Sequence, residues 1–73
     1  MKQINTNLVN WAVACVHEFA RYKGLSPKAA FQYLKAFGGI AFLKEHYEIE
    51  HTLSLDDTVE DLESVCRNEG GHF

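Results

Sequence analysis

The chain has 73 residues, of which 47% are hydrophobic and 12% aromatic, so its composition is that of a folded protein with one core. Its net charge of −3 is unevenly spread: residues 1–44 hold six of the seven basic residues and one acid, and residues 45–73 hold nine acids and one base. Either one half faces a charged partner, or the two halves fold together and complement each other. No apolar run approaches the roughly 20 residues of a membrane span. The N-terminus lacks the features of a signal peptide, so we expect a cytoplasmic protein.

The apolar spacing predicts a first helix over residues 7–23, with Asn7 as N-cap and Gly24 as the left-handed residue after its end. One stripe recurs at steps of three and four residues: Leu8, Trp11, Ala12, Cys15, Phe19 and Tyr22. Val9 and Val16 widen it. So wide an apolar face suits a helix packed by several neighbours, and it also permits a homodimer.

A second helix is predicted over residues 27–37, capped by Ser26 and begun by Pro27, whose missing N–H costs nothing there. Its expected buried face is Ala30, Phe31, Leu34 and Phe37. A Gly-Gly pair ends it, and a short third helix follows over residues 40–47 with Ile40, Leu43 and Tyr47 on one side. Residues 48–53 alternate apolar and polar positions, but with no second strand to pair with we expect a connection.

The last helix is predicted over residues 55–68, where the Ser54 hydroxyl can cap the N–H of Asp57 while Asp57 reaches back. Its expected buried stripe is Leu55, Val59, Leu62 and Cys66. Gly70 and Gly71 close it, and we expect a frayed tail over 70–73. The fold class is therefore all-α, a compact bundle of about four short helices in one domain.

The residues that could carry chemistry do not form a recognisable site. Cys15 and Cys66 lie on apolar helix faces and are expected to be buried free thiols, and neither belongs to a CxxC pair. His46 and His51 are five residues apart, which does not place them on one helix face, and no compact ligand cluster surrounds them. No nucleophile elbow and no glycine-rich phosphate loop occur. We expect no enzymatic activity, no metal and no cofactor.

A nucleic-acid-binding alternative rests on the two short helices 27–37 and 40–47, which meet at a Gly-Gly turn like a helix-turn-helix. A recognition helix should present Arg, Lys, Asn or Gln to bases and phosphates. The second helix of this pair offers Lys44, Glu45 and His46, and acidic residues follow it. Phosphate contacts dominate affinity for DNA, so the acidic flank opposes binding. A small dimeric regulator that uses the basic half is the alternative function, and an oligomerisation domain is another.

The leading hypothesis is a protein-binding module. Three acidic residues of the last helix face outward: Asp57, Glu60 and Asp61. A charged helix face is usually solvated surface. Its functional interpretation is a docking face for a basic partner, which favours fast, salt-sensitive association.

Residues 46–57 resemble a motif of a family of small bacterial proteins, domain of unknown function 3791. Tyr47, His51 and Thr52 match a Tyr-x-x-x-His-Thr segment, and Val59 and Leu62 match apolar positions that follow it. The acidic half is heavier here than in the family pattern. The resemblance implies a companion of a protein encoded beside it, in an antitoxin or immunity-type role, with no activity to carry over. We expect His51, Thr52 and Ser54 to shape the fold, and Tyr47 with the acidic helix to contact the partner.

Overall fold

The computed structural model describes residues 6–72, which form five helices: α1 (Thr6–Lys23), α2 (Pro27–Ala36), α3 (Gly39–Glu45), α4 (Tyr47–Glu50) and α5 (Leu55–Asn68). Within this range there is no strand, so the predicted all-α class is confirmed. The chain is compact, with a radius of gyration of 11.6 Å. None of the helices in this range has the length and apolar character needed to cross a membrane.

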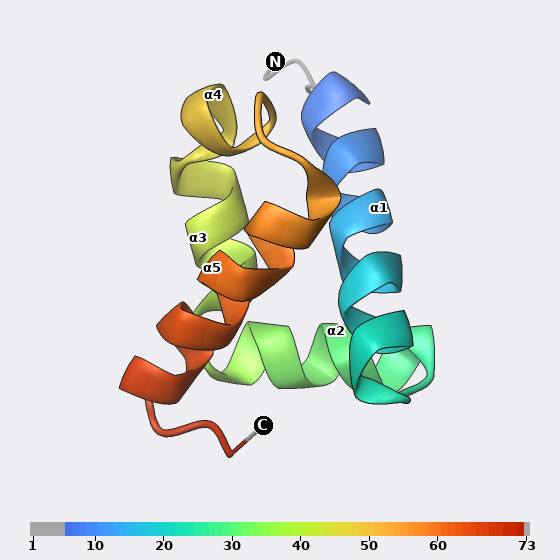
Figure 1. Cartoon of the computed structure of the whole chain (residues 1–73), viewed down its shortest axis with the longest axis vertical. Helices are drawn as coiled ribbons and strands as arrows, with labels where there is room; N and C mark the ends of the chain where they lie inside the picture. The colour runs from blue at the N-terminus through green and yellow to red at the C-terminus, as the bar shows by residue number, and fades with distance from the viewer. Residues whose placement is uncertain (1–5, 73) are drawn as a thin grey trace, which may run out of the picture.

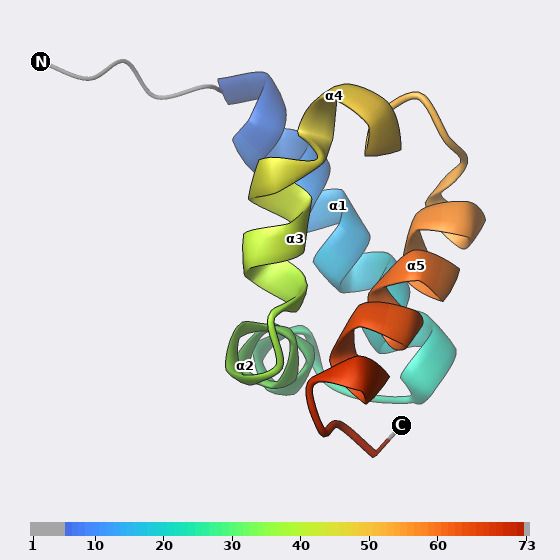
Figure 2. The same ribbon diagram turned by 90° about the vertical axis from the view of Figure 1, so that its left-hand side faces the viewer.

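The first three helices form a U (Figure 1). α1 runs down one arm, α2 crosses the base and α3 returns along the other arm, with α4 continuing beyond it. α5 lies across one side of this U and contacts both arms (Figure 2). The core therefore lies between the U and α5, and the opposite side of the U is left without a covering helix.

Serine caps fix the starts of α2 and α5 at the positions that the sequence predicts. The Ser26 hydroxyl accepts a hydrogen bond from the Ala29 N–H (3.1 Å), and the Ser54 hydroxyl accepts one from the Asp57 N–H (3.1 Å). Among residues 6–72 the Ser54 N–H does not donate to the Asp57 carboxylate, so only half of the capping box forms. Glycines in the left-handed region end the preceding helices, Gly24 after α1 (φ 66°) and Gly38 after α2 (φ 83°).

The core contains ten buried apolar residues contributed by every helix except α4. They are Cys15, Val16, Phe19, Ala20, Ala30, Leu34, Leu43, Val59, Leu62 and Cys66. Three of the four residues of the predicted stripe on α5 are among them, and the fourth, Leu55, is half-buried. Full burial of a large side chain such as Phe19, Leu34, Leu43 or Leu62 stabilises the fold by about 1.5–3 kcal/mol.

Two aromatic residues differ from the expected pattern. Phe31 was expected in the core but is 44% exposed on α2. Tyr33 takes the inner position, half-buried, with its ring stacked on Phe19 (centroids 5.9 Å apart) and tilted against Phe37 (4.9 Å). α2 crosses α1 at the base of the U, and in this orientation Tyr33 lies on the side of α2 that contacts α1. Tyr22 is also half-exposed, and its hydroxyl donates to the Asp56 carboxylate (2.6 Å).

The region between the third and last predicted helices also differs from expectation. The predicted helix 40–47 is wrong at both ends: α3 begins at Gly39 and ends at Glu45. The expected connection 48–53 instead contains the single-turn helix α4. Gly39 is buried against Leu34, and a Cβ atom there would lie 2.8 Å from the Leu34 Cδ2 atom. The close approach of α2 and α3 explains why helix geometry resumes directly after Gly38.

The end of α5 follows the predicted glycines. The Gly71 N–H donates to the Cys66 carbonyl (2.8 Å), and Gly71 lies against the Tyr33 side chain. His72 is exposed, and Phe73 lies outside the described residues. The tail predicted over 70–73 is therefore anchored at Gly71 by one backbone hydrogen bond.

Candidate functional site

The acidic face of α5 consists of Asp57, Glu60 and Asp61. Asp57 and Glu60 are exposed, and neither carboxylate forms an ion pair with any residue from 6 to 72. Asp61 is half-buried, and its carboxyl group lies close enough to Glu50 of α4 to raise the pKa of Glu50. Of the three predicted acidic contact residues, two are therefore open to a partner and the third is engaged inside the chain.

The two oppositely charged halves of the sequence neutralise each other only slightly. One salt bridge of the described chain joins them, from Lys23 Nζ to a Glu63 carboxylate oxygen (2.6 Å). Arg21 instead pairs with Glu18 (2.7 Å), which belongs to its own half. The remaining described lysines, Lys28, Lys35 and Lys44, are exposed and have no ion pair within residues 6–72. The folded surface thus keeps most of the charge separation that the sequence shows.

Tyr47 begins α4 and is half-buried between two other aromatic rings. Its ring meets Trp11 of α1 edge-on (centroids 5.4 Å apart) and stacks on His51 (4.5 Å). Such ring pairs are worth about 0.5–1.5 kcal/mol beyond their buried area. Tyr47 therefore ties α4 to the start of α1, and only part of the residue is open to a partner.

His51 and Thr52 close α4 through hydrogen bonds to its backbone carbonyls. The His51 Nδ1–H donates to the Tyr47 carbonyl (2.6 Å), which fixes the proton on Nδ1 because a carbonyl oxygen can only accept. The Thr52 hydroxyl donates to the Ile49 carbonyl (2.6 Å). The same two carbonyls also accept backbone hydrogen bonds, Tyr47 from the His51 N–H (3.0 Å) and Ile49 from the Thr52 N–H (3.1 Å), so each side chain adds a second bond at the end of α4. The chain then turns to Ser54, the cap of α5.

A buried carboxyl group, Glu50, escaped the sequence reasoning. It is 6% exposed, its Oε1 atom has no hydrogen-bond partner, and its backbone carbonyl accepts from the Thr58 hydroxyl (3.4 Å). Burial, together with the neighbouring Asp61 carboxyl group, raises the pKa of Glu50 to about 7. The only sequence signal is its place in the alternating run Glu48-Ile49-Glu50, which does not indicate which residue turns inward.

The two cysteines lie in the core as free thiols, as the sequence predicts. Burial, with a smaller effect from the charge of Glu50, raises the pKa of Cys15 to about 12, and burial also raises the pKa of Cys66. Thiols with raised pKa are protonated at neutral pH and are poor nucleophiles. Among residues 6–72, no group of three or more His, Cys, Asp or Glu side chains is placed to hold a metal ion.

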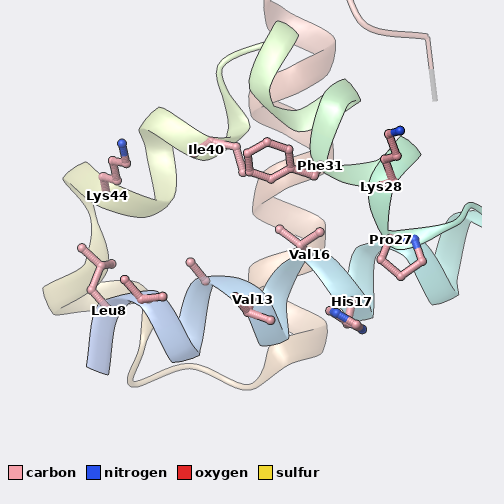
Figure 3. A pocket seen from close by; sticks show the side chains of 11 residues that line it. Leu8, Val13, Val16, His17, Pro27, Lys28, Phe31, Ile40 and Lys44 are labelled. Carbon is pink, nitrogen blue, oxygen red and sulfur yellow. The ribbon is translucent and has the colours of Figure 1, made fainter. Parts of the chain in front are cut away.

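An apolar groove of about 560 Å³ lies on the uncovered side of the U (Figure 3). Its lining comes from α1, α2 and α3, and α5 lies behind these helices in that view. The lining residues are Leu8, Val9, Ala12, Val13, Val16, His17, Pro27, Lys28, Phe31, Ile40 and Lys44. The exposed Phe31 is thus explained, since its ring forms part of this groove.

Comparison with known proteins gives one family. A family model described as "Protein of unknown function (DUF3791)" matches residues 10–69. The chain belongs to this family. The match spans the segment 47–52 and every helix at least in part, and it confirms the family resemblance noted in the sequence. Comparisons with curated proteins and with solved structures gave no significant match. The DUF3791 description assigns no activity.

Proposed function

We propose that this chain is a non-enzymatic protein-binding module that captures a basic protein through the acidic face of α5 and the neighbouring segment 47–52. The family resemblance implies that the partner is encoded beside it in a bacterial genome and that the role is of the antitoxin or immunity type. The chain would act in the cytoplasm by occupying its partner's surface.

The observation that carries this proposal is the unpaired charge on the acidic face. Asp57 and Glu60 are exposed and have no ion pair among residues 6–72, although an ion pair between Lys23 and Glu63 forms elsewhere on the same helix. Carboxylates fixed on a rigid helix attract a basic surface and accelerate association, and salt weakens that attraction. A binding role through this face needs no pocket and no catalytic group.

The test is a charge reversal at Glu60. The protein encoded beside the chain is co-expressed with it, and the Kd of the purified pair is measured by calorimetry at low and high salt. We expect Glu60→Lys to weaken binding about tenfold at low salt and by less at high salt. Glu45→Lys is the matched control, because it makes the same charge change at an exposed position on α3. The control should change the Kd by less than about twofold.

Asp57→Asn is a second variant that removes a charge without reversing it, and circular dichroism verifies that each variant is folded. If Glu60→Lys and Asp57→Asn bind the neighbouring protein as tightly as the unchanged chain at low salt, the acidic face is not the docking surface. If the neighbouring protein does not bind at all, the companion role is wrong.

A nucleic-acid-binding regulator is the second candidate, and it is favoured by one observation, the three unpaired lysines of the basic half. The helix that would read bases, α3, has seven residues and presents Lys44 beside Glu45. A gel-shift titration with the chain's own promoter DNA at low salt tests this candidate, and absence of a shift removes it.

A further inference from the structure

We propose that the apolar groove across α1, α2 and α3 binds an amphipathic helix with acidic flanks, presented by a partner protein. The inference rests on the proposed function in that it assumes a protein partner, but it uses a different face. α5 contributes no residue to the groove lining and lies behind it in Figure 3.

The groove has the apolar lining and the length of a helix-binding surface. On α1 it runs from Leu8 to His17, which is about 14 Å at the helical rise of 1.5 Å per residue. Three side chains at positions i, i+4 and i+7 of a bound helix span about 10 Å, so they fit along this length. Val13 is 51% exposed and Phe31 is 44% exposed, so a bound helix would cover apolar surface that now faces water.

The charges at the groove select acidic flanks on the bound helix. Lys28 of α2 and Lys44 of α3 both line it and have no ion pair within residues 6–72. His17 on α1 is the third polar side chain of the lining, and no carboxylate is part of it. Figure 3 shows Lys44 near the Leu8 end of the groove and Lys28 near the His17 end. A helix with acidic residues beside its apolar stripe therefore meets a cation near each end, whereas a basic helix meets like charges.

A second copy of the chain fits the groove poorly. Pairing two grooves face to face across a twofold axis would bring Lys28 and Lys44 of both copies together without a carboxylate between them. The exposed apolar residues near α4 are Ile49 in its single turn and Leu53 in the non-helical segment that follows. They cannot supply a third side chain farther along the groove, so a separate helix with a longer apolar stripe is the better occupant.

The probe is a designed, fluorescently labelled helical peptide of about 15 residues, with leucines at i, i+4 and i+7 and glutamates on the flanking positions. Its matched control carries a lysine in place of each glutamate. Fluorescence anisotropy at low salt should show the acidic peptide binding at least about tenfold more tightly than the basic one. The variant K28E/K44E should reverse this preference, and Val13→Lys should weaken binding of the acidic peptide about tenfold or more. All three positions are exposed, so the variants should stay folded.

Three results would overturn the proposal: no binding of the acidic peptide up to about 1 mM, equal binding of the two peptides, or binding that K28E/K44E and Val13→Lys leave unchanged. Sedimentation of the chain alone supplies a fourth, because a dimer that Val13→Lys dissociates would make a second copy the occupant. Failure here is distinguishable from failure of the proposed function. Glu60→Lys lies outside the groove and should not alter peptide binding, while K28E/K44E leaves the acidic face intact.

Discussion

Glu50 of α4 is buried, and the Asp61 carboxyl group of α5 lies near its side chain. Its pKa is raised from 4.5 to about 7 by burial and by this acidic neighbour. Between these two pH values the folded chain holds a proton that the unfolded chain has lost. Stability therefore falls as the pH rises from about 4.5 to about 7 and stays at the lower level above that range.

We expect Glu50→Gln to raise the free energy of unfolding by about 2 kcal/mol at pH 8, because an amide of nearly the same shape removes the buried charge. The variant should lose most of the decline between pH 5 and 7. Urea denaturation at several pH values measures both effects. Glu48→Gln, at the neighbouring exposed position, is the control and should keep the decline. Equal pH profiles for Glu50→Gln and the unchanged chain would contradict the buried, protonated state.

The surroundings of Gly39 leave no room for a side chain. A Cβ atom there would lie 2.8 Å from Leu34 Cδ2 and 3.2 Å from the Leu34 carbonyl oxygen. We expect Gly39→Ala to destabilise the fold by about 2 kcal/mol through overpacking, as measured by urea denaturation. Gly24→Ala is the comparison, because nothing lies within 4 Å of its Cβ position and only its positive φ opposes a side chain. It should cost about 1 kcal/mol, and a larger loss there than at Gly39 would contradict the close contact of α2 and α3.

At the scale of the elements, the sequence predicts the helix starts and ends that depend on interactions between residues close together in the chain. Ser26 with Pro27 and Ser54 with Asp57 mark two helix starts because the cap is a hydrogen bond within four residues. Gly24 and Gly38 mark helix ends because only glycine adopts positive φ without strain. The family segment likewise predicts that His51 and Thr52 shape the fold, and both close α4. It predicts Tyr47 as a partner contact, whereas the Tyr47 ring packs on Trp11 and His51.

The features that the sequence missed depend on packing between elements. The angle at which α2 crosses α1 decides whether Phe31 or Tyr33 faces the core. The spacing of apolar residues in α2 does not determine that angle. α4 is a single turn, too short for a periodic pattern, and its His51 and Thr52 bonds exist only once the turn has formed. The groove could not be predicted either, because it is formed by the absence of a helix on one side of the U.

The cap at Ser54 allows a direct test of how α5 is held. We expect Ser54→Ala to lower the free energy of unfolding by about 1 kcal/mol, because the Asp57 N–H loses its hydroxyl acceptor. Ser64→Ala is the matched control, since Ser64 is an exposed interior position of the same helix where alanine is favoured. Thermal unfolding of the two variants gives the comparison. A loss at Ser64 as large as at Ser54 would show that the cap does not stabilise α5.

At the scale of the whole molecule, the fold keeps two different surfaces apart. α5 covers one side of the U and displays unpaired carboxylates, while the other side holds an apolar groove flanked by Lys28 and Lys44. Within residues 6–72 one salt bridge joins the basic and acidic halves of the sequence, from Lys23 to Glu63. Most of the positive and negative charge of the two halves therefore remains unpaired on the surface. The acidic face attracts basic ligands and repels acidic ones, and the lysines at the groove do the reverse. This separation suits a chain that contacts a larger partner at more than one place.

The central claim, that the chain is a protein-binding module acting through the acidic face, is tested most directly by mapping its contact surface. Isotope-labelled chain is titrated with the protein encoded beside it, and backbone amide shifts are followed by nuclear magnetic resonance. We expect the largest changes at Asp57, Glu60 and their neighbours on α5, and smaller changes in the segment 47–52. Unchanged spectra at equimolar partner, or changes confined to residues away from these two regions, would contradict the account.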